Sequence, residues 1–494
     1  MSDSIKALYT TQQIRQCEHQ AIDVLNLSEE ALMMRAGVAA LGTLKSVYPD
    51  VRTIAVFCGG GNNGGDGYVL ARLAHQQGFS VIVYQYKVHE DLPDAAQRAA
   101  RAAMTAGVLC QNIDDHIDNE VELVVDALLG IGLEGDVYGP IEHAINLINE
   151  SGLPVLALDV PSGLQADTGR VLGCCVIATV TTTFIARKVG LFTLDGPDQC
   201  GKIICHSLQL EACLVGIQPA AFILDERAVQ GVISPRKKNS HKGLFGHVLI
   251  VGGGPGMPGA PYLAALAALR VGAGSVTIAT LPEHAGKVLP SLPEVMIHAI
   301  DDVNDLLPLL ARATVCVLGP GLGESPWAKL LFNATIAAQL PLVMDASALR
   351  LLAQDPQHDD HWVLTPHPGE AASLLACSIA DIQHDRCKAA ELMQLRYGGS
   401  VVLKGVGSVV KSSTGDTYIC TAGNPGMASA GMGDVLSGVI GGLLAQGVAL
   451  ADAARLGVWL HAHAADIAVL SQGERGLVAS DLMQHLRRQI NALG

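Results

Sequence analysis

Short apolar runs that alternate with amphipathic stretches constrain the fold of this chain more than any other feature. In the first half, five runs have the length and composition of buried strands: 53–58, 80–86, 123–127, 155–160 and 178–185. Helical periodicity marks residues 1–50 and the segments 68–77, 95–105 and 141–149. Strands that alternate with helices predict a parallel sheet with helices on both faces. We therefore predict a Rossmann-like, doubly wound α/β fold for this half.

A second alternating series begins near residue 245. Its predicted strands are 247–251, 275–279, 314–318, 342–345, 363–365 and 401–403. Its predicted helices are 261–271, 370–375, 434–444 and 451–470. Between the two series, residues 211–240 show weak periodicity and end in the polar segment Ser-Pro-Arg-Lys-Lys-Asn-Ser, which is typical of a domain boundary. We predict two α/β domains, at 1–220 and 221–494.

The composition excludes several classes of protein. Of the 494 residues, 49% are apolar, only 4% are aromatic and 54 are glycine, and small residues let helices lie close to parallel strands. The net charge of −15 and the lack of a long basic tract argue against a nucleic-acid partner. No apolar run has membrane-spanning length, no signal pattern opens the sequence, and the twelve cysteines lack metal or disulfide spacing. We expect a cytoplasmic protein with reduced thiols that binds neither nucleic acid nor membrane.

The segment 424–442 carries the most specific chemistry. Small residues lead into Gly431-Met432-Gly433-Asp434, and an apolar helix-like stretch follows. A helix start without bulky side chains presents backbone N–H groups and a positive dipole end to an anion. Asp434 would repel a bound phosphate, so we predict that it takes a proton from a substrate hydroxyl while the N–H groups hold the phosphoryl group. The alternative is a tightly packed helix that Asp434 merely caps.

Other predicted strand ends of the second half carry polar or glycine-rich motifs. Asp345 ends one strand, and His367 and Glu370 follow another within a Pro-flanked turn. Glycines in 319–323 let the backbone approach a ligand closely. The run 404–408 follows a strand and could hold nucleotide phosphates, although it is no Walker A loop. Together these motifs predict phosphoryl transfer from a nucleotide to an activated hydroxyl.

In the first half, a strand leads into the run Gly-Gly-Gly-Asn-Asn-Gly-Gly-Asp-Gly at 59–67. This contains G-x-G-x-x-G, a weak dinucleotide fingerprint, but residues 84–87 supply no acid to complete it. Because Asn62, Asn63 and Asp66 add polar groups, we infer a phosphate- or ribose-binding loop. A purely structural glycine turn is the alternative.

Two further strands of this half end in carboxylates, Asp126 and Asp159. The carboxyl ends of neighbouring parallel strands line one crevice, so these side chains should converge with the asparagines after the first strand. Oxygen ligands of this kind suit a hard cation, but such a cluster can also orient ribose hydroxyls or move protons. Lys188, after a later strand, could supply a positive charge there. Each acid taken alone would also fit a cap or a turn.

Six motifs, found in order along the chain, resemble those of one known family: Asn62-Asn63-Gly-Gly-Asp66-Gly, Asp159-Val-Pro-Ser162-Gly-Leu, Ser240-His-Lys-Gly243, Thr365-Pro-His367-Pro-Gly-Glu, Val402-Leu-Lys404-Gly-Val-Gly-Ser408 and Gly426-Met-Ala-Ser-Ala-Gly-Met-Gly-Asp434. Over nearly its whole length the chain resembles the bifunctional NAD(P)H-hydrate repair enzymes. These join an NAD(P)H-hydrate epimerase domain to an ADP-dependent NAD(P)H-hydrate dehydratase domain of ribokinase-like fold.

The resemblance implies a function for each predicted domain. Domain 1–220 would interconvert the R and S forms of hydrated NADH and NADPH (NADHX and NADPHX), with a potassium ion bound. Domain 221–494 would dehydrate the S form to NAD(P)H at the expense of ADP, accompanied by magnesium, giving AMP and phosphate. The small-molecule partners would be NADHX, NADPHX and ADP, and we expect a homo-oligomer.

The resemblance also implies individual roles. In the first domain the hydrate-binding positions would be Asn62, Asn63, Gly64, Gly65, Asp66, Gly130, Ile131, Gly132, Leu133, Glu134, Gly135, Asp136 and Asp159, and the potassium ligands would be Asn63, Asp126 and Ser162. In the second domain the hydrate-contacting positions would be Ala260, Gly323, His367 and Asp434, and the ADP-contacting ones Lys404, Gly405, Val406, Gly407, Ser408 and Gly433. The candidates for catalysis are Asp434 as base, and Asp159 with Lys188 for proton movement in epimerisation.

The chain departs from the usual family pattern at three positions. Met34 stands where many relatives have Glu, Ser347 where Asp is commoner, and Gly254 where an acid is frequent. Two rival functions follow from the same motifs. One is a ribokinase-type kinase of a small alcohol fused to a regulatory domain. The other is a first domain that has lost catalysis and serves as a scaffold for partner proteins, against which the intact set of polar residues at the strand ends argues.

Overall fold

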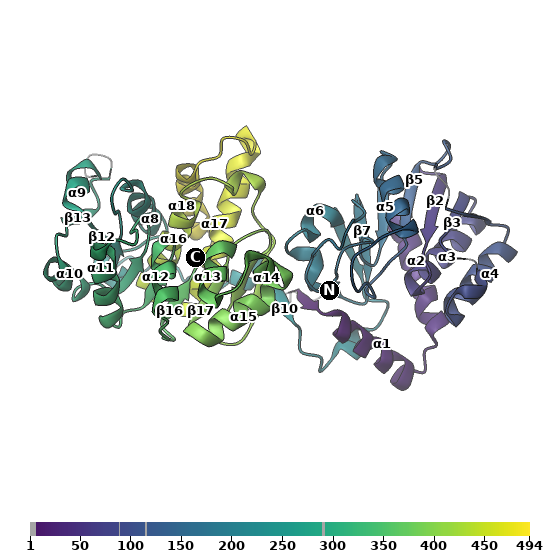
Figure 1. Cartoon of the computed structure of the whole chain (residues 1–494), viewed down its shortest axis with the longest axis horizontal. Helices are drawn as coiled ribbons and strands as arrows, with labels where there is room; N and C mark the ends of the chain where they lie inside the picture. The colour runs from purple at the N-terminus through teal and green to yellow at the C-terminus, as the bar shows by residue number, and fades with distance from the viewer. Residues whose placement is uncertain (1–5, 88, 114–115, 289–291) are drawn as a thin grey trace. The chain divides into compact units, whose positions relative to one another are not determined.

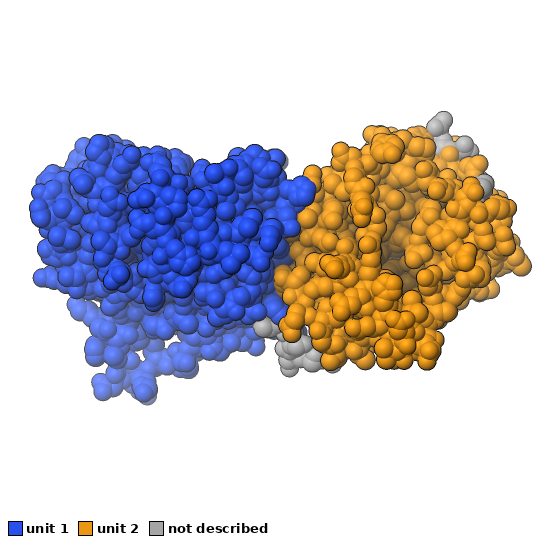
Figure 2. Space-filling model, turned by 60° about the horizontal axis from the view of Figure 1, so that its bottom comes forward, with its two compact units in different colours: residues 1–6, 222–494 blue, residues 7–221 orange. Residues whose placement is uncertain are grey.

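The computed structural model describes residues 6–87, 89–113, 116–288 and 292–494. These residues form two compact units, which Figure 2 draws in different colours. We call Ala7–Ala221 the N-terminal unit, and Lys6 with Phe222–Gly494 the C-terminal unit. Both combine a mainly parallel sheet with helices on its two faces, so the predicted α/β class is confirmed.

The N-terminal unit is built on a parallel sheet of order β4-β3-β2-β5-β6-β7-β9. Its strands are β2 (Thr53–Cys58), β3 (Ser80–Gln85), β4 (Leu109–Asn112), β5 (Leu123–Ala127), β6 (Val155–Leu158), β7 (Val180–Phe184) and β9 (Lys202–His206). A short parallel pair joins β1 (Ala7–Tyr9) to β8 (Arg187–Lys188). The chain adds β3 and β4 on one side of β2 and then places β5 on its other side. The carboxyl ends of β2 and β5 therefore flank the point at which such sheets bind ligands.

Helices cover both faces of this sheet. They are α1 (Thr11–Leu25), α2 (Glu29–Val47), α3 (Asn62–Gln76), α4 (Asp94–Thr105), α5 (Pro140–Glu150) and α6 (Gly196–Cys200). The apolar sides of α1 to α4 pack into one core with one face of the strands, and α5 forms a second core on the opposite face (Figure 1).

The C-terminal unit contains strands in the order β13-β12-β11-β14-β15-β16-β17-β18-β19-β10. They are β10 (Ala221–Leu224), β11 (His247–Val251), β12 (Ser275–Thr280), β13 (Met296–Ala299), β14 (Val315–Leu318), β15 (Leu342–Met344), β16 (Trp362–Leu364), β17 (Ser400–Leu403), β18 (Ser408–Lys411) and β19 (Thr417–Cys420). All neighbours run parallel except β18, which is antiparallel to β17 and β19. The strand order reverses between β11 and β14, which marks a second crevice.

The helices of this unit also form two layers. They are α7 (Glu226–Val229), α8 (Gly259–Arg270), α9 (Pro282–Val288), α10 (Val303–Leu310), α11 (Pro326–Ala337), α12 (Ser347–Gln354), α13 (Pro368–Leu375), α14 (Ile379–His384), α15 (Arg386–Tyr397), α16 (Met432–Ala445), α17 (Leu450–Gln472) and α18 (Leu482–Leu493). One core holds α8, α16, α17 and α18, and the other holds α10 to α13 and α15. Within the described residues, none of the helices combines the length and the apolar character that a membrane crossing requires.

One predicted helix begins earlier than expected, with a consequence for the first site. The periodicity predicts a helix from Tyr68, but α3 begins at Asn62, so the polar residues expected in a loop form its first turns. Glycine permits this start, because a side chain on Gly64 would overlap the carbonyl oxygen of Gly59. Close backbone packing of this kind leaves no apolar periodicity, and the helix start is therefore invisible to a hydrophobic pattern.

Candidate active sites

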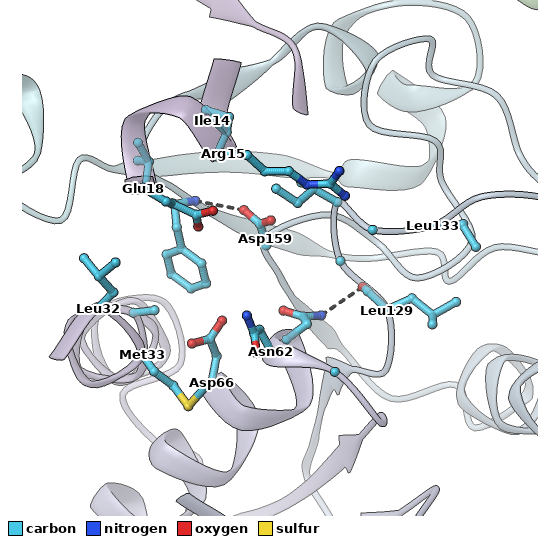
Figure 3. Close-up of a pocket in the computed structure, with 18 of the residues that line it drawn as sticks. Ile14, Arg15, Glu18, Leu32, Met33, Asn62, Asp66, Leu129, Leu133 and Asp159 are labelled. Carbon is cyan, nitrogen blue, oxygen red and sulfur yellow. Dashed lines mark hydrogen bonds between the residues drawn. The ribbon is translucent and has the colours of Figure 1, made fainter. Parts of the chain in front are cut away.

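A cavity of about 780 Å³ lies in the N-terminal unit where its strand order reverses (Figure 3). Its walls come from the first turns of α3, the loops after β5, β6 and β7, and one side of α1 and α2. Nine predicted hydrate-binding positions line it: Asn62, Asn63, Asp66, Gly130, Ile131, Gly132, Leu133, Glu134 and Asp159. The remaining four, Gly64, Gly65, Gly135 and Asp136, are not among its lining residues.

Asp159 and Lys188 form a buried ion pair in this cavity. Asp159 follows β6 with a φ of 64°, a backbone conformation that side chains disfavour. Its Oδ1 accepts hydrogen bonds from Lys188 Nζ and, at 3.2 Å, from the backbone N–H of Phe184. Lys188 Nζ also donates to Thr183 Oγ1 at 3.0 Å and to the Phe184 carbonyl at 2.8 Å. These hydrogen bonds hold the two side chains in one geometry at the wall of the cavity.

Two further carboxyl groups point into the space that Asp159 faces, Asp66 from α3 and Glu18 from α1 (Figure 3). Burial raises the pKa of Asp66 well above its ordinary value, and the charges of Asp159 and Glu18 raise it further. Burial and the charge of Asp159 likewise raise the pKa of Glu18. The cavity thus places two carboxyl groups with raised pKa values beside Asp159, which is paired with the Lys188 ammonium group.

The three predicted potassium ligands meet around the backbone of Leu129, just behind the cavity wall. Asn63 Nδ2 donates to the Leu129 carbonyl at 2.9 Å, and the Leu129 N–H donates to Ser162 Oγ at 2.8 Å. Ser162 also bonds to Asp126 through its hydroxyl and, at 2.8 Å, through its N–H. Burial raises the pKa of Asp126 to about 6 despite hydrogen bonds from Ser162 and from the N–H of Leu128.

This set of oxygen donors fits a hard cation. Asn63 Oδ1 is buried and has no hydrogen-bond partner in the described part of the chain, which is unusual for an amide oxygen. It lies in a cluster with a fully buried carboxylate, a hydroxyl and a carbonyl, all oxygen donors suited to a hard ion. Nowhere among the described residues do three or more His, Cys, Asp or Glu side chains form a metal-binding group.

The faces of α1 and α2 toward the cavity were not expected from the sequence. The lining residues from these helices include Ile14, Arg15, Glu18, Ile22, Leu32, Met33 and Ala36. The spacing of 14, 18 and 22 places these residues on one side of a helix, with a carboxylate in an otherwise apolar row. That interruption is the signal that could have identified Glu18. Met34, one of the departures from the family pattern, is partly exposed on α2 and does not line the cavity.

In the C-terminal unit, Asp434 lies in the first turn of α16. The residue before this helix, Gly431, has a φ of 88°, which glycine adopts without strain. Asp434 is half-buried, and burial raises its pKa to about 7. The charges of Asp345 and Glu370 raise that pKa further, whereas Lys404 opposes the shift. A carboxylate with a near-neutral pKa at a helix N-terminus is suited to act as a general base beside an anion.

Lys404 connects the end of β17 to this turn. Its Nζ lies 2.8 Å from Asp345 Oδ1 and 3.8 Å from Glu370 Oε2. A Cβ atom added to Gly433 would lie 3.3 Å from the same Nζ, so the missing side chain leaves the ammonium group against the helix backbone. The structure therefore brings together a cation, backbone N–H groups and the Asp434 carboxylate, as phosphoryl transfer requires.

His367 is the N-cap of α13 rather than an isolated site residue. Its Nδ1 accepts hydrogen bonds from the N–H groups of Gly369 at 3.0 Å and Glu370 at 3.3 Å. Glu370 Oε2 in return accepts from the His367 N–H at 2.9 Å, which completes a reciprocal cap. The ring remains half-exposed, and its Nε2 lies 3.3 Å from Glu370 Oε1. His367 therefore orients a carboxylate that faces Lys404.

The loops that carry the other predicted positions lie at the same end of the sheet. Ala260 is in the first turn of α8, which packs against α16, and Gly323 follows β14. The Gly323 N–H donates to Ser347 Oγ at 3.0 Å, so a residue that departs from the family pattern helps to hold this loop. Gly254, another such position, donates its N–H to the Gly321 carbonyl at 2.6 Å. A Cβ atom added to Gly254 would lie 2.5 Å from the Leu322 carbonyl oxygen, so the backbone leaves no room for an acidic side chain at this position.

The predicted ADP-contacting run 404–408 connects β17 to β18. Its ends are joined because the Gly405 N–H donates to Ser408 Oγ at 3.2 Å and that hydroxyl lies 2.9 Å from the Gly405 carbonyl. The Lys404 N–H donates to the Pro366 carbonyl at 2.9 Å, which ties the run to the His367 segment. Val406, within this run, is exposed to solvent.

Comparisons with known proteins identify the family. Residues 29–190 match the family described as "YjeF-related protein N-terminus", and residues 248–488 match "NAD(P)H-hydrate dehydratase". A bifunctional NAD(P)H-hydrate repair enzyme of Coxiella burnetii is 48% identical over 485 residues, which cover 98% of this chain and 99% of that relative.

Two solved structures resemble the C-terminal unit. The ADP/ATP-dependent NAD(P)H-hydrate dehydratase of Bacillus subtilis, crystallised with ATP and Mg²⁺, is 27% identical with a TM-score of 0.50, over 55% of this chain and 98% of that one. A ribokinase-like superfamily protein of Enterococcus faecalis is 28% identical with a TM-score of 0.50, over 53% and 92%. This chain, similar to its Coxiella relative from end to end, belongs to the family of bifunctional NAD(P)H-hydrate repair enzymes.

Proposed function

We propose that this chain repairs hydrated NADH and NADPH in two steps. The domain at 1–220 interconverts the R and S forms, and the domain at 221–494 dehydrates the S form with ADP, releasing AMP and phosphate. Family membership supports the overall reaction. The observation that carries the second step is Asp434, a carboxylate with a pKa of about 7 in the glycine-bordered first turn of α16.

In the dehydration, Asp434 takes the proton of the hydroxyl on C6 of the hydrated ring. The freed oxygen attacks the β-phosphorus of ADP, a P–O bond forms, and the bond to the AMP oxygen breaks with its electron pair. The C6–O bond of the phosphorylated ring then breaks, phosphate leaves with the electron pair, and a proton is lost from C5. This restores the double bond, because phosphate is a better leaving group than hydroxide.

The remaining residues of this site neutralise and position charge. Lys404 and the backbone at Gly433 would face the transferred phosphoryl group, while the run 404–408 contacts the nucleotide. Ala260, Gly323 and His367 would contact the hydrate. Magnesium would accompany the nucleotide and screen its phosphates. We assign it no protein ligand, because Asp345 and Glu370 are paired with Lys404 and with the α13 cap.

In the epimerisation, Asp159 and Lys188 would move a proton at the hydroxyl-bearing carbon. Their buried hydrogen-bond network supports this role, since it holds the carboxylate at the wall of a cavity large enough for a nicotinamide ring. The hydrate would lie along the first turns of α3 and the loop 130–136. Helix α3 begins without a side-chain cap, so its first N–H groups are suited to phosphate.

Potassium would be held by Asn63, Asp126 and Ser162. Its charge would balance the buried Asp126 carboxylate and fix the loop around Leu129 that borders the cavity. The unpaired oxygen of Asn63 supports this assignment. All twelve cysteines are free thiols, which supports a reducing compartment such as the cytoplasm. The expected homo-oligomer stays a prediction that light scattering would test.

Asp434→Ala tests the dehydration. The variant should lose the ADP-dependent conversion of the S form while it interconverts the R and S forms at the rate of the unmodified chain. Recovery of the reduced-nicotinamide absorbance reports the dehydration, and chromatography of the R and S forms reports the epimerisation. A variant that repaired the S form at the normal rate would refute the role of Asp434 as base.

Asp159→Ala tests the epimerisation in the converse way. We expect slow exchange of R and S forms and unchanged ADP-dependent loss of the S form, because the two carboxylates belong to separate compact units. Equal exchange rates in variant and unmodified chain would remove Asp159 from the mechanism.

A further inference from the structure

Asp345, at the end of β15, is a buried carboxylate for which the proposed mechanism names no role. Only 2% of its surface is exposed. Its Oδ1 accepts a hydrogen bond from Lys404 Nζ at 2.8 Å, and its Oδ2 accepts one from Ser437 Oγ at 2.8 Å. A buried charge of this kind is costly unless each of its oxygens is paired, and here both are.

These two hydrogen bonds connect Asp345 to the two groups proposed to hold the phosphoryl group, which are the Lys404 ammonium and the first turn of α16. Ser437 lies one turn beyond Gly433 in α16, and its hydroxyl is also 2.9 Å from the Gly433 carbonyl oxygen. A Cβ atom added to Gly433 would lie 3.2 Å from Asp345 Oδ2 and 3.3 Å from Lys404 Nζ. The carboxylate therefore touches both the cation and the helix turn that carries Asp434.

The charges around Asp434 come from several elements. They are Lys404 after β17, Asp345 after β15 and Glu370 from α13. His461 of α17 also lies near Lys404, but burial lowers its pKa to about 4 and leaves it neutral at the working pH. Burial alone would lower the pKa of Lys404, yet Asp345 and Glu370 hold it above the ordinary value. The ammonium group is thus charged and shared among carboxylates.

We propose that Asp345 is a positioning residue for the phosphoryl transfer, which holds the Lys404 ammonium beside Gly433 and fixes the first turn of α16 through Ser437. The inference rests on the proposed function of Asp434. With Asp345 in place, the cation faces the incoming phosphoryl group instead of pairing with the base. Without it, Lys404 would turn to the remaining carboxylates, and Asp434 would lose a neighbouring negative charge.

The competing role for a buried carboxylate at a nucleotide site is that of a magnesium ligand. Its hydrogen bonds argue for positioning, because Lys404 and Ser437 already use one lone pair on each oxygen. The two roles differ in their consequences. A lost ligand should weaken activity at every pH and be compensated by more magnesium, whereas a lost positioning charge should change the pH at which Asp434 ionises.

The test is the pH dependence of kcat/KM for ADP-dependent conversion of the S form. In the unmodified chain it should fall below pH about 7, the pKa of Asp434. In Asp345→Asn the fall should move about one pH unit lower, since a like charge near Asp434 is gone and Lys404 is freed to pair with it. Lys404→Gln should move it in the opposite direction. Ser437→Ala changes no charge and should leave its position unmoved.

Three results would overturn the inference. In the first, kcat/KM of Asp345→Asn is lowered by the same factor at every pH. In the second, high magnesium restores the activity of Asp345→Asn. In the third, kcat/KM of Lys404→Gln falls at a lower pH than that of the unmodified chain. If Asp345→Asn does not fold, the pH profile of Lys404→Gln alone tests the inference. Asp434→Ala separates this inference from the proposed function: if that variant stays active, the base assignment fails. If it is inactive and the Asp345→Asn profile is unmoved, only the role of Asp345 fails.

Discussion

Burial raises the pKa of two carboxyl groups that the proposed chemistry uses, Asp434 and Asp126. Asp126 is fully buried, with its pKa raised to about 6. A carboxyl group with a raised pKa in the folded state costs no free energy below its unfolded pKa. The cost appears as pH rises toward the folded pKa and persists above it, because the buried group must then ionise. A bound cation would offset this cost at neutral pH.

We therefore predict that potassium stabilises the N-terminal unit. Its melting temperature should rise when potassium chloride replaces tetramethylammonium chloride, and a concentration one hundred times the Kd would contribute about 2.7 kcal/mol. The rise should fade below pH about 6 as Asp126 becomes protonated. Asp126→Asn should lose the potassium-dependent part of the melting temperature. A full potassium effect in this variant would contradict the assignment.

The sequence predicts where candidate site residues lie when they follow a strand or a glycine turn, and it misses those on the side of a helix. Asp159, Lys188 and Asp434 stand beside buried apolar runs or glycine turns, so the topology of a parallel sheet places them at its carboxyl end. Glu18 and Arg15 belong to α1, whose orientation depends on how the helix packs onto the sheet. Periodicity identifies the helix and leaves open which of its sides meets a cavity.

Among the strands, the buried ones are those that the apolar pattern of the sequence predicts. The central strands β2, β5 and β11 have almost continuous buried apolar runs, and their bounds agree with the prediction. The edge strands β4 and β13 are shorter and largely accessible to solvent, so they lack the apolar run that the prediction relied on. Their sheet partners, not their own composition, make them strands.

Three glycines, Gly59, Gly60 and Gly61, connect β2 to α3, and the packing of this junction depends on Gly59. A side chain on Gly59 would overlap the carbonyl group of Leu128 after β5, whereas a side chain on Gly61 would meet nothing within 4 Å. Gly59→Ala should therefore lower the free energy of unfolding of the N-terminal unit by about 1–3 kcal/mol, the cost of overpacking. Gly61→Ala is the matched control and should change it little.

Chemical denaturation followed by circular dichroism measures both variants. Epimerisation should decline with stability in Gly59→Ala, because the strand end and the cavity wall share this junction. If the two variants were equally stable, the close approach of Gly59 to Leu128 would not be a constraint on the fold.

At the scale of the whole molecule, the two units have separate hydrophobic cores. Separate cores permit separate folding, and each proposed active site draws its residues from one unit only. The C-terminal unit nevertheless includes Lys6 from the start of the chain. The Ile223 N–H donates to the Lys6 carbonyl at 2.9 Å, and Lys6 Nζ lies 3.6 Å from Asp225 Oδ2.

We predict that the fragments 1–220 and 221–494, produced separately, each retain one reaction. The first should interconvert R and S forms, and the second should consume the S form with ADP at a kcat near that of the whole chain. The second should unfold more easily, by about 1 kcal/mol, because it lacks the backbone partner of Ile223 and the exposed ion pair adds little. Activity that reappeared only on mixing the fragments would show that residues of both units complete one site.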